Sequence, residues 1–179
     1  MKEVSLSWAY RLLHPKLTVL ISSGNGTENV MSAAWVIPVS VHPPLVAVAI
    51  SPKRYTYELI LSSKEFAINV PSVNMLDIVD YCGSVSGRDV NKVASLGLTT
   101  LKPKVIKSPL IKGCAGFLEC KFKEAFKAGD HFLVVGEVVR ACSEDLFDEI
   151  YDVNKFKPLI HLGGDNYCTI SSNIFKPKV

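Results

Sequence analysis

The chain has 179 residues and a mass of 19.6 kDa, which is enough for one sizeable core but short for two, so one domain over residues 1–179 is expected. Hydrophobic residues make up 48% of the sequence and charged residues 21%, which is typical of a globular protein and excludes a disordered one. The net charge is only +3 and the lysines are spread along the chain, so no nucleic-acid partner is expected.

The sequence predicts a cytoplasmic protein without a membrane anchor. Apolar runs such as residues 45–50 are far shorter than the roughly 18 residues that a transmembrane helix needs. Arg11, His14 and Lys16 interrupt any signal-peptide core. The five cysteines include no C-x-x-C pair, so we expect reduced thiols rather than disulfides or a metal site.

Strand patterns dominate the N-terminal part of the chain. Residues 17–22, 30–41 and 45–50 carry Val, Ile, Leu and Thr at strand lengths. Gly24-Asn25-Gly26 can adopt the positive φ angles of a hairpin turn, and His42-Pro43-Pro44 ends the second strand before the third begins. We therefore expect consecutive antiparallel strands.

Three helices are expected in the middle of the chain. The first covers residues 56–62, with Thr56 as a possible N-cap. Asn74 can cap a second helix that ends at Gly83, a residue common just past helix C-termini. A short third helix is expected over residues 89–97.

Further strands surround and follow these helices. The strands are expected over residues 65–70, 116–127, 131–142, 159–162 and 167–170. In the strand that starts at residue 116, Leu118, Cys120 and Phe122 alternate with Glu119, Lys121 and Lys123, so the first set is expected to face the core and the second to face water.

Many short strands with Gly and Pro turns, and a few inserted helices, predict a closed or nearly closed antiparallel β-barrel. A doubly wound α/β sheet is disfavoured because strands and helices do not alternate regularly. Gly24-Asn25-Gly26 also lacks the third glycine of a dinucleotide-binding G-x-G-x-x-G turn.

Two segments suit a flat ring with a phosphate tail. Within residues 29–35, Ser32, Ala33 and Ala34 have so little side-chain bulk that a planar heterocycle can lie against the strand and bond to its peptide groups. Within residues 51–57, hydroxyls and a cation gather where a helix is expected to begin, namely Ser51, Arg54 and Thr56. A helix N-terminus attracts anions and an arginine adds a bidentate clamp, so a nucleotide monophosphate is expected there.

Several further motifs follow these segments in a fixed order. Together they read Asn29-x-Met31-Ser32-x-x-Trp35, Pro43-Pro44, Ser51-x-x-Arg54-x-Thr56, Phe66-x-x-Asn69, Cys82-Gly83, Ser86-Gly87-Arg88-Asp89-x-x-Lys92, Gly129-Asp130-His131 and Gly136-Glu137-Val138. From about Pro15 to Tyr167 the chain resembles the flavin reductase-like family, which includes flavoredoxins and archaeal ferric reductases.

This resemblance implies an antiparallel split β-barrel and a homodimer that binds FMN near the subunit interface. The cofactor-binding residues that it implies are Asn29, Met31, Ser32, Ala33, Ala34, Trp35, Ser51, Arg54, Tyr55, Thr56, Asn69, Ser86, Gly87 and Lys92. It also implies that His131 lies near the flavin edge where a nicotinamide docks, and that His161 lines the same site. The residues alone leave other roles open for three of these side chains. Lys92 also fits a solvated surface lysine, and His131 also fits a structural or exposed histidine. Trp35 also fits a core or interface residue.

If FMN is bound, redox chemistry belongs to the flavin and the protein supplies binding, orientation and tuning. The resemblance then implies an NAD(P)H-dependent FMN oxidoreductase that passes electrons to free flavin, ferric chelates or a partner protein. Two alternatives stay open: a flavoredoxin-type carrier whose flavin is reduced by another protein, and a flavin-binding protein without turnover. The sequence does not choose between NADH and NADPH.

Overall fold

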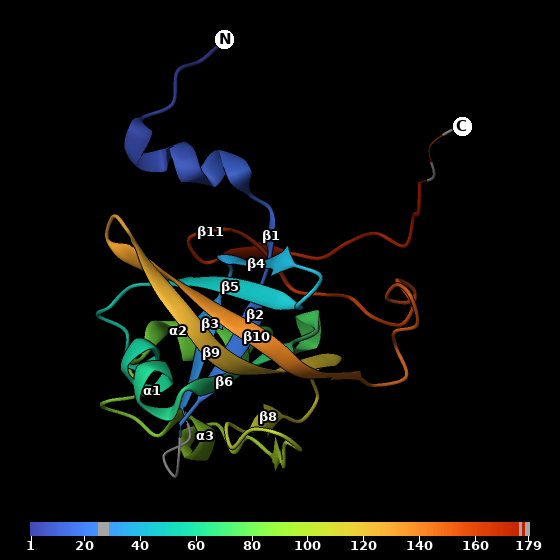
Figure 1. The fold of residues 1–179 in the computed structure, drawn as a ribbon. Coiled ribbons are helices and arrows are strands. Elements are labelled where there is room, and N and C mark those ends of the chain that lie inside the picture. Colours follow the sequence, from blue (N-terminus) through green and yellow to red (C-terminus); the bar gives the residue numbers. More distant parts are fainter. Residues whose placement is uncertain (25–28, 176, 178–179) are drawn as a thin grey trace.

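A computed structural model describes residues 1–24, 29–175 and 177. In it, seven antiparallel strands form one curled sheet (Figure 1). The strands lie in the order β3-β2-β6-β9-β10-β5-β4. Their bounds are β2 Val19–Ser23, β3 Asn29–Ala33, β4 Val36–Ser40, β5 Leu45–Ile50, β6 Glu65–Val70, β9 Gly116–Ala128 and β10 His131–Ser143. The long β9–β10 hairpin crosses the molecule and joins the two halves of the sheet (Figure 1).

The two edges of this sheet are joined by only two residues. Ala34 and Trp35 connect β3 to β4, so the Cα atoms of Ala33 and Val36 are at most about 11 Å apart. The N–H of Ala49 also donates to the carbonyl oxygen of Trp35, at 2.9 Å. The sheet must therefore curl until its edges meet, which confirms the expected antiparallel split β-barrel. The single strand predicted over residues 30–41 is wrong, because the chain crosses between the edges at residues 34–35.

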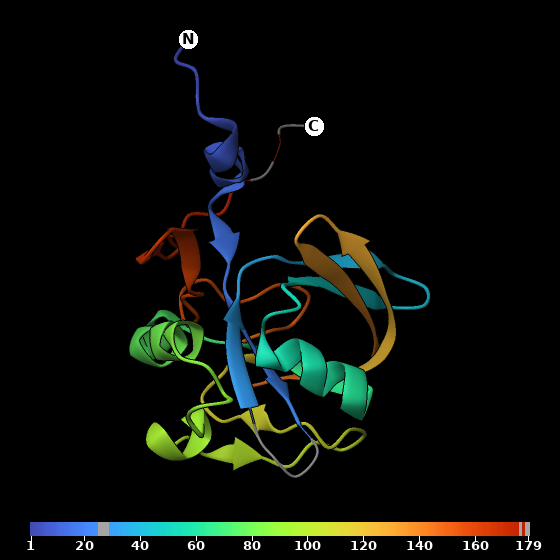
Figure 2. The same cartoon turned by 90° about the vertical axis from the view of Figure 1, so that its left-hand side faces the viewer.

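Smaller elements surround the barrel. A three-stranded sheet contains β1 Lys16–Leu17, β11 Ile160–Gly163 and β12 Asn166–Cys168, and a second sheet pairs β7 Thr100–Leu101 with β8 Leu110–Ile111. The helices are η1 Leu6–Leu13, α1 Tyr55–Ser63, η2 Val73–Met75, α2 Leu76–Ser84 and α3 Lys92–Ser95, where η denotes a 3-10 helix. Figure 2 shows α1 packed beside the barrel, with η1 standing apart from it.

Most predicted elements match the structure closely. Strands β5 and β6 coincide with the predictions, and the β9–β10 hairpin is longer by one residue at the end of each arm. The helix predicted over residues 89–97 contains only the four residues of α3. Of the predicted turn at residues 24–26, Asn25 and Gly26 lie outside the described residues, although β2 and β3 do pair antiparallel.

Two predicted helix ends are wrong, and both differences bear on the site. Helix α1 begins one residue early, with Arg54 rather than Thr56 at the N-cap. Gly83 lies inside α2 instead of after it. Gly83 lies beside Ser32 of β3, since a Cβ atom built on it would be in van der Waals contact with the Ser32 hydroxyl oxygen, at 3.4 Å.

Strands from the middle of the sheet are buried on both faces. Leu20 and Ala67 pack into a core beneath α2, whereas Ile21 and Phe66 pack into a second core inside the barrel. Because adjacent residues of β2 and β6 point to opposite faces, the same strands contribute to both cores. The two cores therefore share one scaffold.

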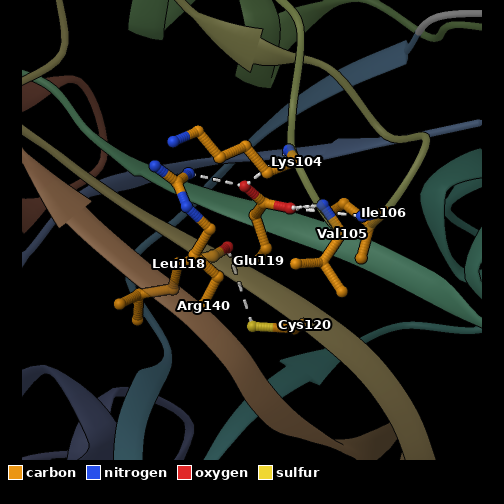
Figure 3. Close-up of polar contacts among 7 residues, drawn as sticks. All are labelled: Lys104, Val105, Ile106, Leu118, Glu119, Cys120 and Arg140. Carbon is orange, nitrogen blue, oxygen red and sulfur yellow. Dashed lines mark hydrogen bonds and ion pairs between the residues drawn. The ribbon is translucent and has the colours of Figure 1, made fainter.

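Glu119 departs from the alternating pattern predicted for β9. It is fully buried, although it was expected to face water together with Lys121, which is exposed. Its carboxylate accepts the backbone N–H groups of Lys104, Val105 and Ile106 at 2.7–3.2 Å and an N–H of Arg140 at 2.7 Å (Figure 3). Burial alone would raise the pKa of this carboxyl, but the four donors outweigh it and lower the pKa.

Candidate functional site

Two adjoining cavities lie along β3. The smaller lies between β3, the start of α1 and the end of α2, and the larger lies between β3, α2, η1 and the β11–β12 hairpin. The larger has a volume of about 430 Å³ and the smaller a volume of about 100 Å³. Arg54 and Gly83 line both cavities. A ligand with a bulky part and a compact anionic part can therefore span them, with a guanidinium group at the junction.

The smaller cavity is built around the N-terminus of α1. This helix has no side-chain cap at its N-cap residue Arg54, so the positive end of its dipole lies at the cavity. Asn29 donates from Nδ2 to the hydroxyl oxygen of Thr56 at 2.8 Å. The other amide atom, Asn29 Oδ1, is buried without a partner in the part of the chain that the structure describes, and any Cβ at Gly87 would overlap it. A residue larger than glycine at position 87 would therefore have to displace the Asn29 amide.

Lys92 is a buried cation in the wall of the smaller cavity. It is 3% exposed, and its Nζ donates to the carbonyl oxygens of Val30 at 2.9 Å and Cys82 at 2.7 Å. Burial lowers the pKa of its ammonium group, and the nearby positive charge of Arg54 lowers it further. No carboxylate pairs with it within the described ranges. This burial excludes the solvated surface lysine, and an anion in the cavity would compensate its charge.

Backbone and small side chains form one side of the larger cavity. Ser32, Ala33 and Ala34 line it from β3 and the residue that follows. The Ser32 hydroxyl donates to the carbonyl oxygen of Val79 in α2, so its proton is directed away from the cavity. A ring placed here would bond mainly to peptide groups of β3 rather than to this hydroxyl group.

Two buried polar atoms of the larger cavity have no partner among the described residues. One is the hydroxyl oxygen of Thr18, a residue that is 3% exposed, and the other is Nδ1 of His161. His161 Nε2 contacts the carbonyl oxygen of Gly164 at 2.8 Å, and a carbonyl only accepts, so this nitrogen carries the proton in the neutral ring. Nδ1 is then an acceptor. A bound ligand with an N–H or O–H group would satisfy it.

The structure brings most of the predicted binding residues together. Those that line the smaller cavity are Asn29, Met31, Arg54, Tyr55, Thr56, Ser86, Gly87 and Lys92, and those that line the larger are Ser32, Ala33, Ala34 and again Arg54. Ser51, Asn69, Trp35 and His131 line neither cavity.

A model of the flavin reductase-like domain matches residues 10–171, which is most of the chain and includes both cavities. The chain belongs to the flavin reductase-like family. An uncharacterized protein from Archaeoglobus fulgidus is 41% identical over 167 residues, which cover 92% of this chain and 94% of that protein.

Solved structures of other proteins share the fold. A flavoredoxin from Methanosarcina acetivorans is 29% identical, with a TM-score of 0.85 over 98% of this chain and 94% of that one. An FMN-binding protein from Thermus thermophilus, solved with p-hydroxybenzaldehyde, is 25% identical, with a TM-score of 0.90 over 99% of this chain and 100% of that one.

Asn69 lies inside this flavin reductase-like barrel rather than in the wall of either cavity. Its Nδ2 donates to the Leu20 carbonyl at 3.1 Å and the Ser22 hydroxyl at 3.0 Å, and its Oδ1 accepts the N–H of Ile111 at 2.8 Å. Its amide group therefore joins β2, β6 and β8 inside the protein. Ser51 accepts an N–H of Lys53 at 3.4 Å, in the turn that precedes α1.

Trp35 and His131 lie together beside the larger cavity. Their ring centroids are 5.1 Å apart, and Tyr10, which lines the cavity, lies 5.5 Å from Trp35. His131 Nδ1 contacts the carboxylate of Asp130 at 2.8 Å, and this hydrogen bond lowers the pKa of Asp130. The Nε2 atom of His131 is left for another partner.

Sequence reasoning missed several residues of this family member's larger cavity. They are Tyr10, Arg11, Thr18, Asp80, Asp165 and Tyr167. Thr18 gave a weak indication as a polar residue between Leu17 and Val19. The other residues come from distant segments, and the sequence gave no indication of them.

No helix in the described parts of the chain is long and apolar enough to cross a membrane.

Proposed function

We propose that this protein binds FMN, with the phosphate in the smaller cavity and the ring in the larger, and that it is an NAD(P)H-dependent oxidoreductase. The observation that carries the proposal is the junction of the two cavities at Arg54. It is supported by the family of the chain and by the Thermus thermophilus relative, which is an FMN-binding protein. The homodimer that the resemblance implies and the cytoplasmic location that the sequence predicts belong to this proposal.

The residues present fit such a cofactor. The smaller cavity offers the Arg54 guanidinium, the Lys92 ammonium, the N-terminus of α1 and the backbone next to Gly87, a donor set suited to a phosphate dianion. In the larger cavity, Thr18 and His161 hold polar atoms that lack a protein partner in the described regions. A bound flavin would supply hydride and one-electron transfer, while the chain binds and orients it.

His131 is the proposed contact for the nicotinamide of the electron donor. It lies on β10 at the hairpin tip, half-buried against Trp35, with Nε2 free to accept a hydrogen bond in the neutral ring. Asp130 fixes this tautomer through Nδ1. Electrons would then pass to free flavin, a ferric chelate or a redox protein.

An anaerobic absorbance titration of the FMN-reconstituted protein tests the proposal. Bleaching of the bound-flavin spectrum by NADH or NADPH is expected. The nucleotide that reduces the flavin faster is identified as the electron donor. Failure of the purified protein to bind FMN would overturn the whole proposal.

Arg54→Ala tests the placement of the phosphate. The change removes a charge-assisted contact worth about 1.5–3 kcal/mol, so FMN should bind roughly tenfold to a hundredfold more weakly by fluorescence quenching. Lys127→Ala, at an exposed position of β9, is the control and should bind as the parent does. Equal affinity in Arg54→Ala and the parent would contradict the phosphate site.

A flavoredoxin-type electron carrier is the second candidate function. The observation that favours it is the likeness to the flavoredoxin from Methanosarcina acetivorans. A carrier would retain FMN but stay oxidised with both nicotinamide nucleotides, and it would be reduced by a redox protein. Bound flavin that reacts with neither nucleotide nor protein donor would instead indicate a binding protein without turnover.

A further inference from the structure

The unpaired polar atoms of this protein are concentrated at the candidate flavin site. Within the described residues, every buried side-chain nitrogen or oxygen atom without a hydrogen-bond partner belongs to His14, Thr18, Asn29 or His161. Asn29 lines the smaller cavity, whereas Thr18 and His161 line the larger one. Because buried polar groups are nearly always paired in folded proteins, these atoms indicate which groups a ligand must offer.

Thr18 and His161 are brought together by the pairing of β1 with β11. Lys16 of β1 lies opposite His161 of β11. Two residues further on, the N–H of Thr18 donates to the carbonyl oxygen of Leu159 at 2.9 Å. Thr18 and His161 are therefore diagonal neighbours on paired segments, and both line the larger cavity. One edge of a small ring can thus contact both side chains.

The His161 ring is held in place by three contacts. Its Nε2 atom donates to the carbonyl oxygen of Gly164 at 2.8 Å. The centroid of the ring lies 5.2 Å from that of His14 and 5.3 Å from that of Tyr167. Gly164 has a φ of +59°, a conformation that favours glycine, so the turn that presents this carbonyl suits its sequence. In the neutral ring, Nδ1 is therefore an acceptor at a fixed position.

An acceptor beside a hydroxyl group requires a particular kind of ligand edge. His161 Nδ1 accepts a hydrogen bond, and the Thr18 hydroxyl can donate one. The matching edge has an N–H next to a carbonyl group, as in a cyclic imide. An oxidised flavin has its one ring N–H at N3, between the carbonyl groups at C2 and C4. The opposite edge of the flavin carries only methyl groups and can pair with neither side chain.

Other groups at the larger cavity do not compete for this N–H. Asp80 and Asp165 line the cavity but are exposed, so water can pair with their carboxylates. Thr18 is 3% exposed and depends on a ligand for a partner. The carboxamide of a nicotinamide also offers an N–H beside a carbonyl. It belongs to an electron donor that leaves after each hydride transfer, however, and buried groups are better satisfied by a cofactor that stays.

We infer that His161 and Thr18 together bind the pyrimidine edge of the flavin. His161 Nδ1 accepts the N3–H, and the Thr18 hydroxyl donates to a neighbouring carbonyl oxygen. These contacts orient the ring with its pyrimidine edge towards β1 and β11 and its methyl groups away from them. The inference rests on the proposed function.

Binding of 3-methyl-FMN tests the contact with His161. In this analogue a methyl group replaces the N3 hydrogen, so the parent should bind it at least about tenfold more weakly than FMN by fluorescence quenching. His161→Ala removes the acceptor and leaves room for the methyl group, so it should bind the two flavins within about twofold of each other. His161→Asn keeps an acceptor near the Nδ1 position and should retain the parental preference. His42→Ala changes an exposed histidine that lines neither cavity and should bind both flavins as the parent does.

Thr18→Val tests the contact with the carbonyl group, because it replaces the hydroxyl with a methyl group of similar size. FMN affinity should fall about threefold to tenfold, as expected for one hydrogen bond, while the preference for FMN over 3-methyl-FMN persists. Thr99→Val, at an exposed position outside both cavities, is the control. Equal FMN affinity in Thr18→Val and the parent would overturn the role of Thr18.

The outcomes separate this inference from the proposed function. A parent that binds FMN and 3-methyl-FMN equally would overturn the inference alone. A preference that persists in His161→Ala would also overturn it, because another group would then exclude the methyl. A parent that binds neither flavin contradicts the proposed function and the inference with it.

Nuclear magnetic resonance of the bound cofactor gives a second readout, which does not depend on affinity. With FMN labelled at N3 by the heavy nitrogen isotope, the N3–H signal of the complex should move in His161→Ala and stay in place in His42→Ala. An N3–H signal at the parental position in both variants would contradict the contact with His161.

Discussion

Lys92 shows how a single buried side chain can report on an anion site. Its ammonium group donates to two carbonyls and faces the smaller cavity without a carboxylate partner in the described chain. Burial lowers its pKa, so the protonated form that would attract a phosphate is lost at a lower pH than for an ordinary lysine. Phosphate binding favours the protonated form and should reverse part of this shift.

FMN affinity should therefore fall as the pH rises through the lowered pKa of Lys92. The complex binds more protons than the free protein in this window, so linkage gives a dissociation constant that increases with pH. Fluorescence quenching at several alkaline pH values measures the slope. Lys92→Met should bind FMN more weakly with a smaller slope, whereas Lys53→Met, at an exposed position of the same cavity, should keep the parental slope. A parental slope in Lys92→Met would exclude Lys92 as the titrating group.

Gly87 offers a steric test of the same cavity. A Cβ atom there would overlap Asn29 Oδ1, so Gly87→Ala must displace the Asn29 amide from its contact with Thr56. We expect FMN to bind at least about tenfold more weakly, with little loss of helix or sheet by circular dichroism. Ser95→Ala, an exposed change in α3, serves as control. Unchanged affinity in Gly87→Ala would show that no ligand uses this wall.

The residues that sequence reasoning found and missed differ in a physical way. Arg54 and the small residues 32–34, which line the cavities, were predicted because anion binding and ring packing would need residue types that are conspicuous locally. The burial of Glu119 was missed because alternation places it on the same face as Lys121, whereas the donors that stabilise it there come from segment 104–106 and from Arg140 of β10. Long-range contacts of this kind leave no local pattern.

At the scale of elements, Glu119 fastens the segment before β8 to the barrel. Glu119→Ala removes an acceptor of four hydrogen bonds and leaves Arg140 without its carboxylate, so the free energy of unfolding should fall by about 3 kcal/mol or more. Urea denaturation measures the loss. Glu124→Ala, at an exposed position of the same strand, should change stability by less than about 0.5 kcal/mol.

The acid stability of the parent tests the same contact. Because the pKa of Glu119 is lowered in the folded protein, its stabilisation is complete above the unfolded pKa of about 4.3 and disappears as the pH falls through the folded value. Glu119→Gln should therefore lose less stability on acidification than the parent. Equal pH dependence in the two proteins would contradict the role of the carboxylate.

The break between β3 and β4 marks the limit of prediction for elements. Residues 30–41 were predicted to form one strand because neither Ala34 nor Trp35 is a residue type typical of turns and the apolar pattern continues across them. What interrupts the strand is closure of the sheet, a property of all seven strands. By contrast, β5 and β6 end at Pro, Ser and Lys-rich turns and were found with their full bounds.

At the scale of the whole molecule, the two cores share strands β2 and β6, so neither can lose its packing without the other. We therefore expect one domain that unfolds in a single transition, followed equally by far-ultraviolet circular dichroism and by the fluorescence of Trp35 in a Trp8→Phe variant. FMN at a hundred times its dissociation constant should stabilise this transition by about 2.7 kcal/mol, since only the folded cavities bind it. A fluorescence transition that FMN shifts while the circular dichroism transition stays in place would mean that the site and the barrel unfold separately.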